Sequence, residues 1–288
     1  MSDTVSAPRR VGVLGGGRMG AGIAHAFLLA GSEVSVVERD AASAASARSR
    51  VTDSIRRSVQ RDPALDEDAL AGRLTTDVDP AAFATAGLVI EAVPEDRDLK
   101  EAALARAEAA MPAHAVLASN TSSISIDDLA AARRRPERFV GLHFFNPVPA
   151  STLVEIVRGA QTDGSVVDSA AEWVTALGKT PIVVSDSPGF ASSRLGVMLG
   201  LEAIRMLEEG VASAADIDAA MTLGYRHPMG PLRTTDVVGL DVRLGIADEL
   251  ERTLGERFAA PELLRRMVAE GKLGRKSGEG FYEWNEER

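Results

Sequence analysis

The chain has 288 residues, of which 45% are hydrophobic and none is cysteine, so it is long enough for two domains and has no disulfide, thiolate nucleophile or cysteine metal site. Its formal net charge of −10 argues against nucleic-acid binding, which needs a basic face. No stretch approaches the roughly 20 apolar residues that span a membrane, and residues 1–10 contain no apolar run, so we expect no membrane contact, no secretory signal, no metal site and a cytoplasmic location.

Short apolar runs typical of β-strands alternate with Ala-rich segments of helical periodicity through the first part of the chain. The runs are residues 11–14, 34–37, 88–93, 116–118, 139–144, 153–157 and 182–184, and the predicted helices between them include 21–30, 99–111 and 166–177. This alternation predicts an α/β fold with an N-terminal Rossmann-type, doubly wound and mostly parallel sheet.

The pattern changes after Asp186, where Pro188 and Gly189 interrupt the chain and the β-like runs stop. The segments 194–209, 213–223, 231–254 and 261–270 all read as helices, and Ser213 with Asp216 three residues later is a plausible N-cap. We therefore predict an NAD-binding domain over residues 1–186 and an all-α domain over residues 187–288.

The segment 15–20 (GGGRMG) lies between a predicted strand and a predicted helix and matches G-x-G-x-x-G. Gly15 permits the tight turn, Gly17 lets the backbone approach a pyrophosphate, and Gly20 allows close helix–strand packing. The helix N-terminus that follows favours phosphate groups. A Rossmann turn without a cofactor is the alternative, but the context favours dinucleotide binding by the whole loop, namely Gly15, Gly16, Gly17, Arg18, Met19 and Gly20.

Glu38 follows the next predicted strand, 18 residues after Gly20. A carboxylate there accepts hydrogen bonds from the ribose hydroxyls and repels a 2′-phosphate, so we predict NAD. Arg39 comes next and attracts a 2′-phosphate, so NADP stays open.

Oxidation of an alcohol by hydride transfer needs a base for the hydroxyl proton. The chain has four histidines, and His143 differs from the others because it closes the run 139–144, at the carboxyl end of a strand where α/β sheets bind ligands. Glu155 lies in the next apolar run, where a carboxylate is costly unless it is paired. Adjacent strands would bring Glu155 to His143, either to fix the imidazole tautomer for catalysis or as a structural ion pair.

A series of motifs runs through both predicted domains in order. They are 15–24 (GGGRMGAGIA), 91–95 (EAVPE), 119–123 (SNTSS), 141–149 (GLHFFNPVP), 153–156 (LVEI), 186–190 (DSPGF), 227–231 (HPMGP), 238–241 (VGLD) and 274–282 (GRKSGEGFY). On these motifs the chain closely resembles the 3-hydroxyacyl-CoA dehydrogenase family, especially its members that act on 3-hydroxybutyryl-CoA.

The resemblance implies an acyl-CoA substrate, NAD as cofactor and a homodimer formed through the helical domain. It implies that His143 is the base, that Glu155 is its partner and that Ser122 hydrogen-bonds the substrate oxygen near the nicotinamide. Further implied cofactor contacts are Glu95, Lys100, Asn146 and Lys276, and implied contacts to the CoA moiety are Ser54 and Arg61. Arg56, Arg57 and Arg61 form a basic strip that meets CoA phosphates on this view, or is simply a solvated helix face.

Two departures from the family pattern concern the substrate. Ser193 stands where the family usually has an asparagine that donates to the thioester or oxyanion, and loss of such a donor can cost on the order of 100-fold in turnover. Residues 150–152 (AST) replace bulkier and basic residues. These changes leave open a carrier-protein thioester or a free 3-hydroxy acid, of the carnitine or gulonate type, as substrate. A non-catalytic NAD-binding protein is the reading least favoured.

Overall fold

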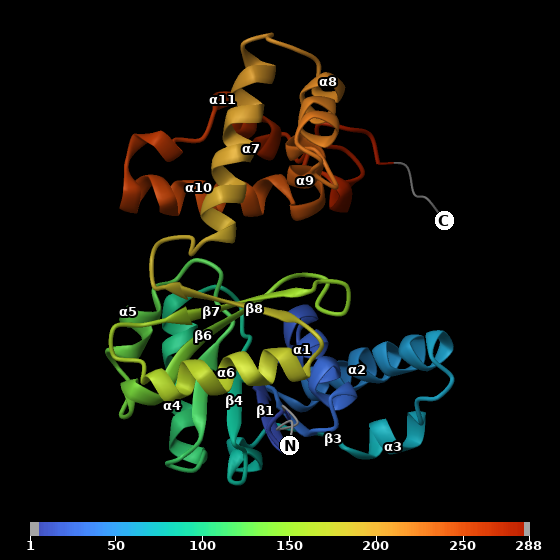
Figure 1. Ribbon diagram of the computed structural model, residues 1–288, viewed down its shortest axis with the longest axis vertical. Coiled ribbons are helices and arrows are strands. Elements are labelled where there is room, and N and C mark those ends of the chain that lie inside the picture. The colour runs from blue at the N-terminus through green and yellow to red at the C-terminus, as the bar shows by residue number, and fades with distance from the viewer. Residues whose placement is uncertain (1–5, 285–288) are drawn as a thin grey trace. The chain divides into compact units, whose positions relative to one another are not determined.

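The computed structural model describes residues 6–284 and divides into two compact units, Met1–Ser187 and Pro188–Arg288 (Figure 1). Each unit is described below by itself. Within the described range, every helix is too short or too polar to cross a membrane.

The first unit is built on one sheet of eight strands in the order β3-β2-β1-β4-β5-β6-β7-β8. Strands β1 to β6 pair in parallel, β7 runs antiparallel to β6, and β8 is parallel to β7. The predicted doubly wound, mostly parallel sheet is therefore confirmed. The strands are β1 (Arg10–Leu14), β2 (Glu33–Val37), β3 (Leu74–Asp77), β4 (Leu88–Glu91), β5 (Val116–Ser119), β6 (Phe139–Phe144), β7 (Leu153–Arg158) and β8 (Thr180–Ser185).

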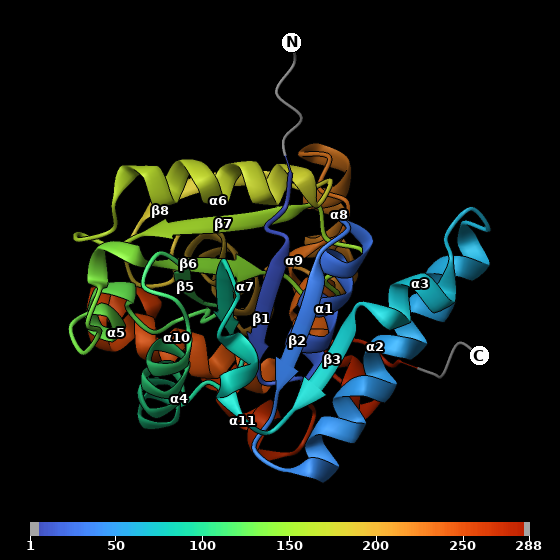
Figure 2. The same cartoon turned by 90° about the horizontal axis from the view of Figure 1, so that it is seen from below.

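Helices cover both faces of this sheet (Figure 2). On one face, α1, α2 and α6 contribute Ile23, Ile55 and Val166 to a core cluster that also contains Val13 of β1. On the other face lie η1 and α4, and Gly12 leaves the space that Phe83 fills, because a Cβ there would stand 2.5 Å from its ring. The elements are α1 (Arg18–Leu29), α2 (Ala41–Arg61), α3 (Glu67–Gly72), η1 (Pro80–Phe83), α4 (Arg97–Ala110), α5 (Ile126–Ala130), η2 (Pro136–Arg138) and α6 (Gly164–Ala176).

The second unit is helical, as predicted, around a core that includes Val197, Leu232 and Leu264. Ser213 caps α8 by accepting a hydrogen bond from the Asp216 N–H, which confirms the predicted N-cap. The elements are α7 (Ser192–Glu208), α8 (Ala214–Ala219), the π-helical turn η3 (Ala220–Gly224), α9 (Pro231–Val238), α10 (Leu240–Leu254), η4 (Glu256–Phe258), α11 (Glu262–Ala269) and η5 (Arg275–Ser277).

The elements differ from the sequence prediction in three places. The edge strand β3 was not predicted, because LTTD has one apolar residue and no clear period. The helix predicted over 213–223 is the short helix α8 followed by the π-helical turn η3. The single helix predicted over 231–254 is two helices, since Gly239 adopts φ 106° between α9 and α10, a conformation that ends a right-handed helix.

One buried histidine predicts how stability depends on pH. The Nε2 atom of His25 on α1 lies 3.0 Å from the Ser58 hydroxyl of α2. Burial, together with the positive charges of Arg57 and Lys179, lowers the pKa of His25 from 6.5 to about 4. Between pH 6.5 and 4, His25 is therefore protonated in the unfolded chain but neutral in the folded chain. The stability that neutral His25 allows is fully present above pH 6.5 and is lost as the pH falls toward 4.

We expect His25 to remove about 3 kcal/mol of the free energy of unfolding across that window, at about 1.4 kcal/mol per pH unit. Urea unfolding of the wild type and of His25→Gln at several pH values measures the difference. The exposed His114 supplies the control, because His114→Gln should keep the wild-type pH profile. Equal pH slopes for wild type and His25→Gln would contradict the prediction.

Candidate active site

The candidate site residues of the first unit gather at the carboxyl edge of the sheet. Parallel pairing of β1, β4, β5 and β6 brings the segments that follow them to one edge. These segments carry the glycine loop after β1, Glu95 after β4 and Ser122 after β5, and His143 is the penultimate residue of β6. Ligands bind at this edge in open α/β sheets, next to the point where the strand order reverses.

The glycine loop has the conformation that its sequence predicts. Gly15 has φ 92°, and a Cβ at Gly20 would stand 1.8 Å from the Gly15 carbonyl oxygen, so neither position accepts a side chain. Nothing lies within 4 Å of the place where a Gly17 Cβ would be. Gly17 is the N-cap of α1 and offers no capping side chain, so the first N–H groups of the helix face open space that suits a pyrophosphate.

Glu38 is held beside this loop by backbone hydrogen bonds. Its Oε1 accepts from the Gly16 N–H at 2.7 Å and its Oε2 from the Arg39 N–H at 3.1 Å. The Arg39 guanidinium turns to Asp40, with Nε 3.2 Å from Oδ2. A negative charge is thus fixed where the ribose of a dinucleotide is expected, while the neighbouring positive charge has a carboxylate of its own. This arrangement fits NAD better than NADP.

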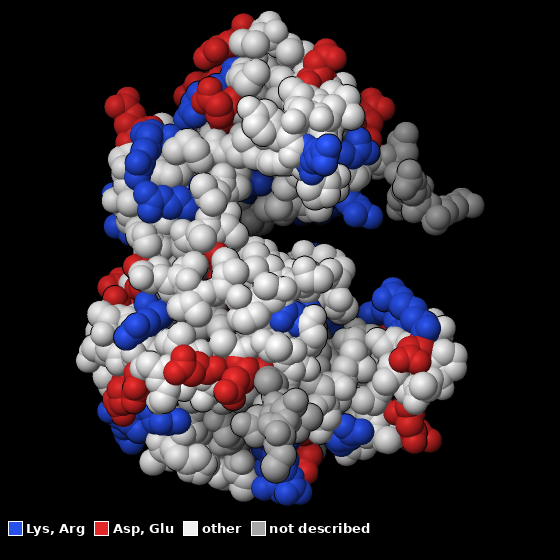
Figure 3. Space-filling model, in the orientation of Figure 1, with Lys and Arg blue, Asp and Glu red and all other residues white. Residues whose placement is uncertain are grey.

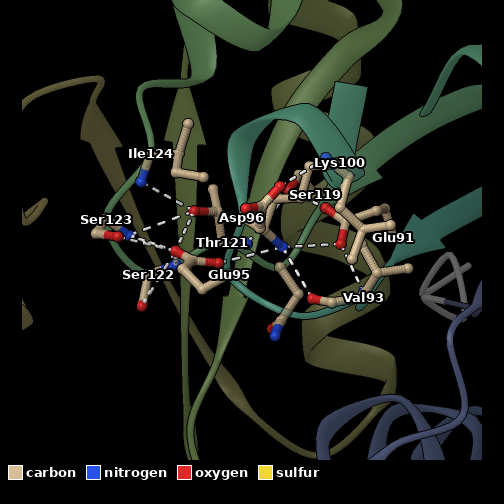
Figure 4. Close-up of polar contacts among 12 residues, drawn as sticks. Glu91, Val93, Glu95, Asp96, Lys100, Ser119, Thr121, Ser122, Ser123 and Ile124 are labelled. Carbon is tan, nitrogen blue, oxygen red and sulfur yellow. Dashed lines mark hydrogen bonds and ion pairs between the residues drawn. The ribbon is translucent and has the colours of Figure 1, made fainter. Parts of the chain in front are cut away.

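A buried ion-pair network lies behind the neighbouring loop (Figure 4). The Lys100 side chain is 1% exposed, and its ammonium donates to the Glu91 carboxylate at 2.8 Å and to the Val93 carbonyl at 3.2 Å. It also lies 3.2 Å from Glu95 Oε2. Glu91 is fully buried and accepts further hydrogen bonds from the Ser119 hydroxyl and the Val93 N–H. Lys100 is therefore a buried cation paired with Glu91 and Glu95.

Glu95 fastens the loop that carries Ser122. Its Oε1 accepts from the Thr121 hydroxyl at 2.6 Å and from the Ser122 and Ser123 N–H groups at 2.9 and 3.1 Å. Burial alone would raise the pKa of Glu95, but Lys100 and these hydrogen bonds outweigh it and hold the pKa below its ordinary value. Glu95 therefore stays ionised at neutral pH. Lys100 acts on the site indirectly, because its ammonium pairs with the carboxylate that holds the Ser122 loop.

His143 and Glu155 form the pair that the sequence suggested. The antiparallel register of β6 and β7 sets the two residues directly opposite each other, and His143 Nδ1 lies 2.7 Å from Glu155 Oε2 with both side chains buried. A carboxylate is an acceptor only, so Nδ1 carries the proton and the lone pair is on Nε2. That tautomer suits a base. The Phe145 ring packs on the imidazole with centroids 4.5 Å apart.

The segment after His143 is held by two other side chains, those of Asn120 and Lys179. Asn120 Oδ1 accepts the Phe144 N–H at 2.9 Å, which ties the end of β6 to the loop of Ser122. Lys179 donates to the Val148 and Ser151 carbonyl oxygens. Residues 150–152 lack the family's basic side chains, but the ammonium of Lys179 binds the backbone of this segment. Asn146 is exposed and precedes a cis proline.

The predicted CoA contacts lie on α2, away from the sheet edge. The Ser54 hydroxyl accepts from Arg57 at 3.0 Å. Arg56 pairs with Asp53 and Glu67 and so contributes no net charge to the predicted strip. Arg57 and Arg61 have no carboxylate partner within residues 6–284, and Figure 3 shows basic side chains gathered over the far end of α2.

Two predicted site residues belong to the second unit. The Lys276 ammonium binds both carboxylate oxygens of Asp241, at 2.5 and 2.6 Å. Ser193 is the second residue of α7.

Sequence reasoning missed several residues that support the site. Glu91 lies inside the quoted motif 91–95, and an acid in a buried apolar run was the available signal. Thr121 and Asn120 lie inside the motif 119–123, but their partners are about 25 residues away and no local pattern shows them.

A Rossmann sheet, a glycine loop before an uncapped helix and an acid after β2 define the class of NAD-dependent dehydrogenases. Two family models match: "3-hydroxyacyl-CoA dehydrogenase, NAD binding domain" over residues 10–187, and "3-hydroxyacyl-CoA dehydrogenase, C-terminal domain" over residues 189–284. The chain belongs to the 3-hydroxyacyl-CoA dehydrogenase family, and NAD is its cofactor.

Relatives with the same family assignment match this chain over nearly its whole length. A 3-hydroxybutyryl-CoA dehydrogenase of Mycobacterium tuberculosis is 44% identical over 98% of this chain and 99% of its own. The crystal structure of M. tuberculosis FadB2 has a TM-score of 0.92 at 44% identity, covering 97% of this chain and 100% of that one. The (S)-3-hydroxybutyryl-CoA dehydrogenase PaaH1 from Ralstonia eutropha also has a TM-score of 0.92, at 37% identity and the same coverage.

Proposed function

We propose that this chain interconverts a short (S)-3-hydroxyacyl-CoA and the 3-oxoacyl-CoA with NAD(H), and that His143 is the general acid and base. The observation that carries the proposal is the buried His143–Glu155 pair at the carboxyl edge of the sheet, 2.7 Å between Nδ1 and Oε2. The names of the relatives support the substrate class.

The residues have distinct tasks in the oxidation. NAD, when bound, supplies the hydride acceptor. Ser122 hydrogen-bonds the 3-hydroxyl oxygen, and His143 Nε2 takes the hydroxyl proton as the C3–H hydride leaves. The Glu155 carboxylate stabilises the imidazolium that forms. The reduction returns the same proton from His143 to the 3-oxo oxygen.

We propose that residues 1–186 bind NAD and that residues 187–288 bind substrate and form the dimer. The cofactor residues of the first domain are the glycine loop, Glu38, Glu95, Ser122 and Asn146, with Lys100 acting through Glu95 because it is buried. Lys276 and Ser193 of the helical domain complete the cofactor and thioester contacts. Ser54 and Arg61 meet the CoA moiety. We place the protein in the cytoplasm, where NAD and CoA thioesters are supplied.

The wild-type enzyme tests this function directly. Acetoacetyl-CoA should oxidise NADH, while the free acid acetoacetate should be a poor substrate at equal concentration. Faster turnover of the free acid would favour the alternative that Ser193 and residues 150–152 suggest. Absence of turnover on any thioester, with NADH still bound, would favour a non-catalytic protein.

The position of Glu38 predicts cofactor choice. Because a 2′-phosphate would meet this carboxylate, we expect kcat/KM for NADH to exceed that for NADPH on the order of 100-fold. Glu38→Ser removes the repulsion and leaves Arg39, so the preference should fall at least about tenfold. The surface variant Glu33→Gln, at the first residue of β2, is the matched control and should keep the wild-type ratio. An unchanged ratio in Glu38→Ser would refute this role.

The helical unit carries exposed apolar side chains that support the proposed homodimer. Leu223 is 83% exposed, and Leu195 and Tyr225 are nearly as open, whereas single-chain proteins bury most such side chains. We expect light scattering to give twice the 30.3 kDa chain mass. Leu223→Asp should raise the dimer dissociation constant at least tenfold if Leu223 lies in the interface. A monomeric wild type would contradict the proposal.

A further inference from the structure

The helical unit contains a buried arginine that lacks a partner. Arg243 on α10 is 5% exposed. Its Nε atom is fully buried without a hydrogen bond, and within residues 6–284 no carboxylate forms an ion pair with its guanidinium. The other buried or half-buried cations of this fold, such as Lys100 and Lys179, bind carboxylate or carbonyl oxygens.

Two glycines of α7 make room for this guanidinium. A Cβ at Gly196 would stand 3.5 Å from Arg243 Nη1, and a Cβ at Gly200 would stand 3.4 Å from Nε. The Thr235 hydroxyl of α9 lies 3.1 Å from the Gly200 position and donates to the Pro231 carbonyl, but it does not accept a hydrogen bond from Arg243 Nε. The arginine therefore lies along the small-residue face of α7 and receives no hydrogen-bond acceptor from it.

An uncompensated charge in such a place is costly, because burial removes hydration without replacing it. Burial lowers the pKa of Arg243 to about 10, so the guanidinium still carries its charge at neutral pH. The acids of the neighbouring segments are committed elsewhere: Asp236 accepts from the Phe281 and Tyr282 N–H groups, and Asp241 binds Lys276. An anion that pairs with the Arg243 guanidinium therefore has to come from outside residues 6–284.

The same face of α7 carries a position that concerns the substrate. Residues three and four apart are neighbours on a helix, so Ser193, Gly196 and Gly200 follow one another along this face. Family resemblance assigns the position of Ser193 to the thioester, and serine there is smaller than asparagine. Gly196 lies only about 4.5 Å farther along the axis, which is within the length of a short acyl chain.

We propose that Arg243 binds a carboxylate at the far end of the acyl chain, so that the preferred substrate is a CoA thioester of a 3-hydroxy dicarboxylic acid. The inference rests on the proposed function and narrows its substrate class. The spacing along α7 suits a dicarboxylic acyl chain of about five or six carbons. Because Ser193, Gly196 and Gly200 are small, no large side chain of this face of α7 stands between the Ser193 position and the guanidinium.

Two substrates of equal length test the proposal: 3-oxoadipyl-CoA, which ends in a carboxylate, and 3-oxohexanoyl-CoA, which ends in a methyl group. With NADH and the wild-type enzyme, we expect kcat/KM to favour the acid by roughly 10- to 100-fold, the value of a charged hydrogen bond. In Arg243→Met this ratio should fall at least tenfold, mainly through KM for the acid. Arg243→Lys keeps the charge and should retain part of the preference. The exposed Arg266→Met on α11 is the matched control and should keep the wild-type ratio.

The outcomes separate the two levels of the proposal. If neither thioester is reduced, the proposed function fails. If both are reduced but the wild type does not prefer the acid, the function stands and the inference is overturned, and this result needs no variant to fold. An unchanged ratio in Arg243→Met also overturns it. The inference is likewise overturned if the only effect of Arg243→Met is loss of the dimer in light scattering, because Arg243 would then belong to a contact with a second copy.

Discussion

His143→Gln is expected to lower kcat for acetoacetyl-CoA reduction by about 10³-fold, the size of a general acid–base contribution. Glutamine keeps a polar side chain of similar volume but cannot exchange a proton at neutral pH. The NADH dissociation constant should stay within about a factor of two, since the glycine loop and Glu38 are untouched. Stopped-flow or steady-state absorbance gives kcat, and NADH fluorescence titration gives the dissociation constant.

His114→Gln is the matched control, because His114 is exposed and lies before β5 at the opposite end of that strand from the site. Turnover within tenfold of wild type in His143→Gln would remove the residue from the chemistry. A loss of both turnover and NADH binding would point to a collapsed loop and would not support a base.

Glu155→Gln then decides between a catalytic pair and a structural ion pair. If the carboxylate stabilises the imidazolium, its loss should lower kcat at least about tenfold while NADH binding is kept. A carboxylate that serves only as a structural ion pair would, when lost, lower the free energy of unfolding and leave kcat near the wild-type value. Measuring kcat and urea unfolding on the same variant therefore separates the two roles.

Local patterns were sufficient to predict the glycine loop and the His143–Glu155 pair at the sheet edge, whereas Glu95 and Ser122 were predicted from the family resemblance. The glycine loop depends on backbone conformations that only glycine adopts freely, so the spacing of its glycines is enough to predict the turn. His143 and Glu155 were predicted as a pair because period-2 geometry and the cost of a buried acid both act over short distances. The antiparallel turn of β7, which aligns them, has no equally clear signal.

What the sequence did not show depends on contacts between distant segments. Lys100 reads as a surface lysine on an Ala-rich helix, and only the packing of α4 beside β4 makes it a buried cation. Arg243 lies in an amphipathic helix, where the sequence alone predicts an exposed arginine on the polar face. Its burial follows from two glycines about 45 positions earlier, which no periodicity connects with it.

Lys100→Met is expected to cost about 3–5 kcal/mol of unfolding free energy, because it leaves Glu91 fully buried without a cation. Burial raises the pKa of Glu91 even in the presence of Lys100. A folded pKa above the unfolded one gives stability that is present at low pH and lost as the pH rises through the folded value. Without Lys100 that pKa rises further, so the deficit against wild type should be smaller at pH 5 than at pH 8. Urea unfolding at both pH values measures it.

The same variant also tests whether the network positions the catalytic loop. Glu95 would lose the cation that holds Oε2, and the loop of Ser122 would lose its anchor, so kcat should fall more than the NADH affinity. Adding Glu91→Gln removes the orphaned charge and should restore most of the stability, because a neutral pair is cheaper to bury than one ion. It should not restore kcat, since Glu95 still lacks Lys100. Lys272→Met, which removes a surface ammonium paired with Glu279, should leave the free energy of unfolding near the wild-type value. If Lys100→Met costs no more than this control, or if its deficit is the same at pH 5 and pH 8, the buried network has no such role.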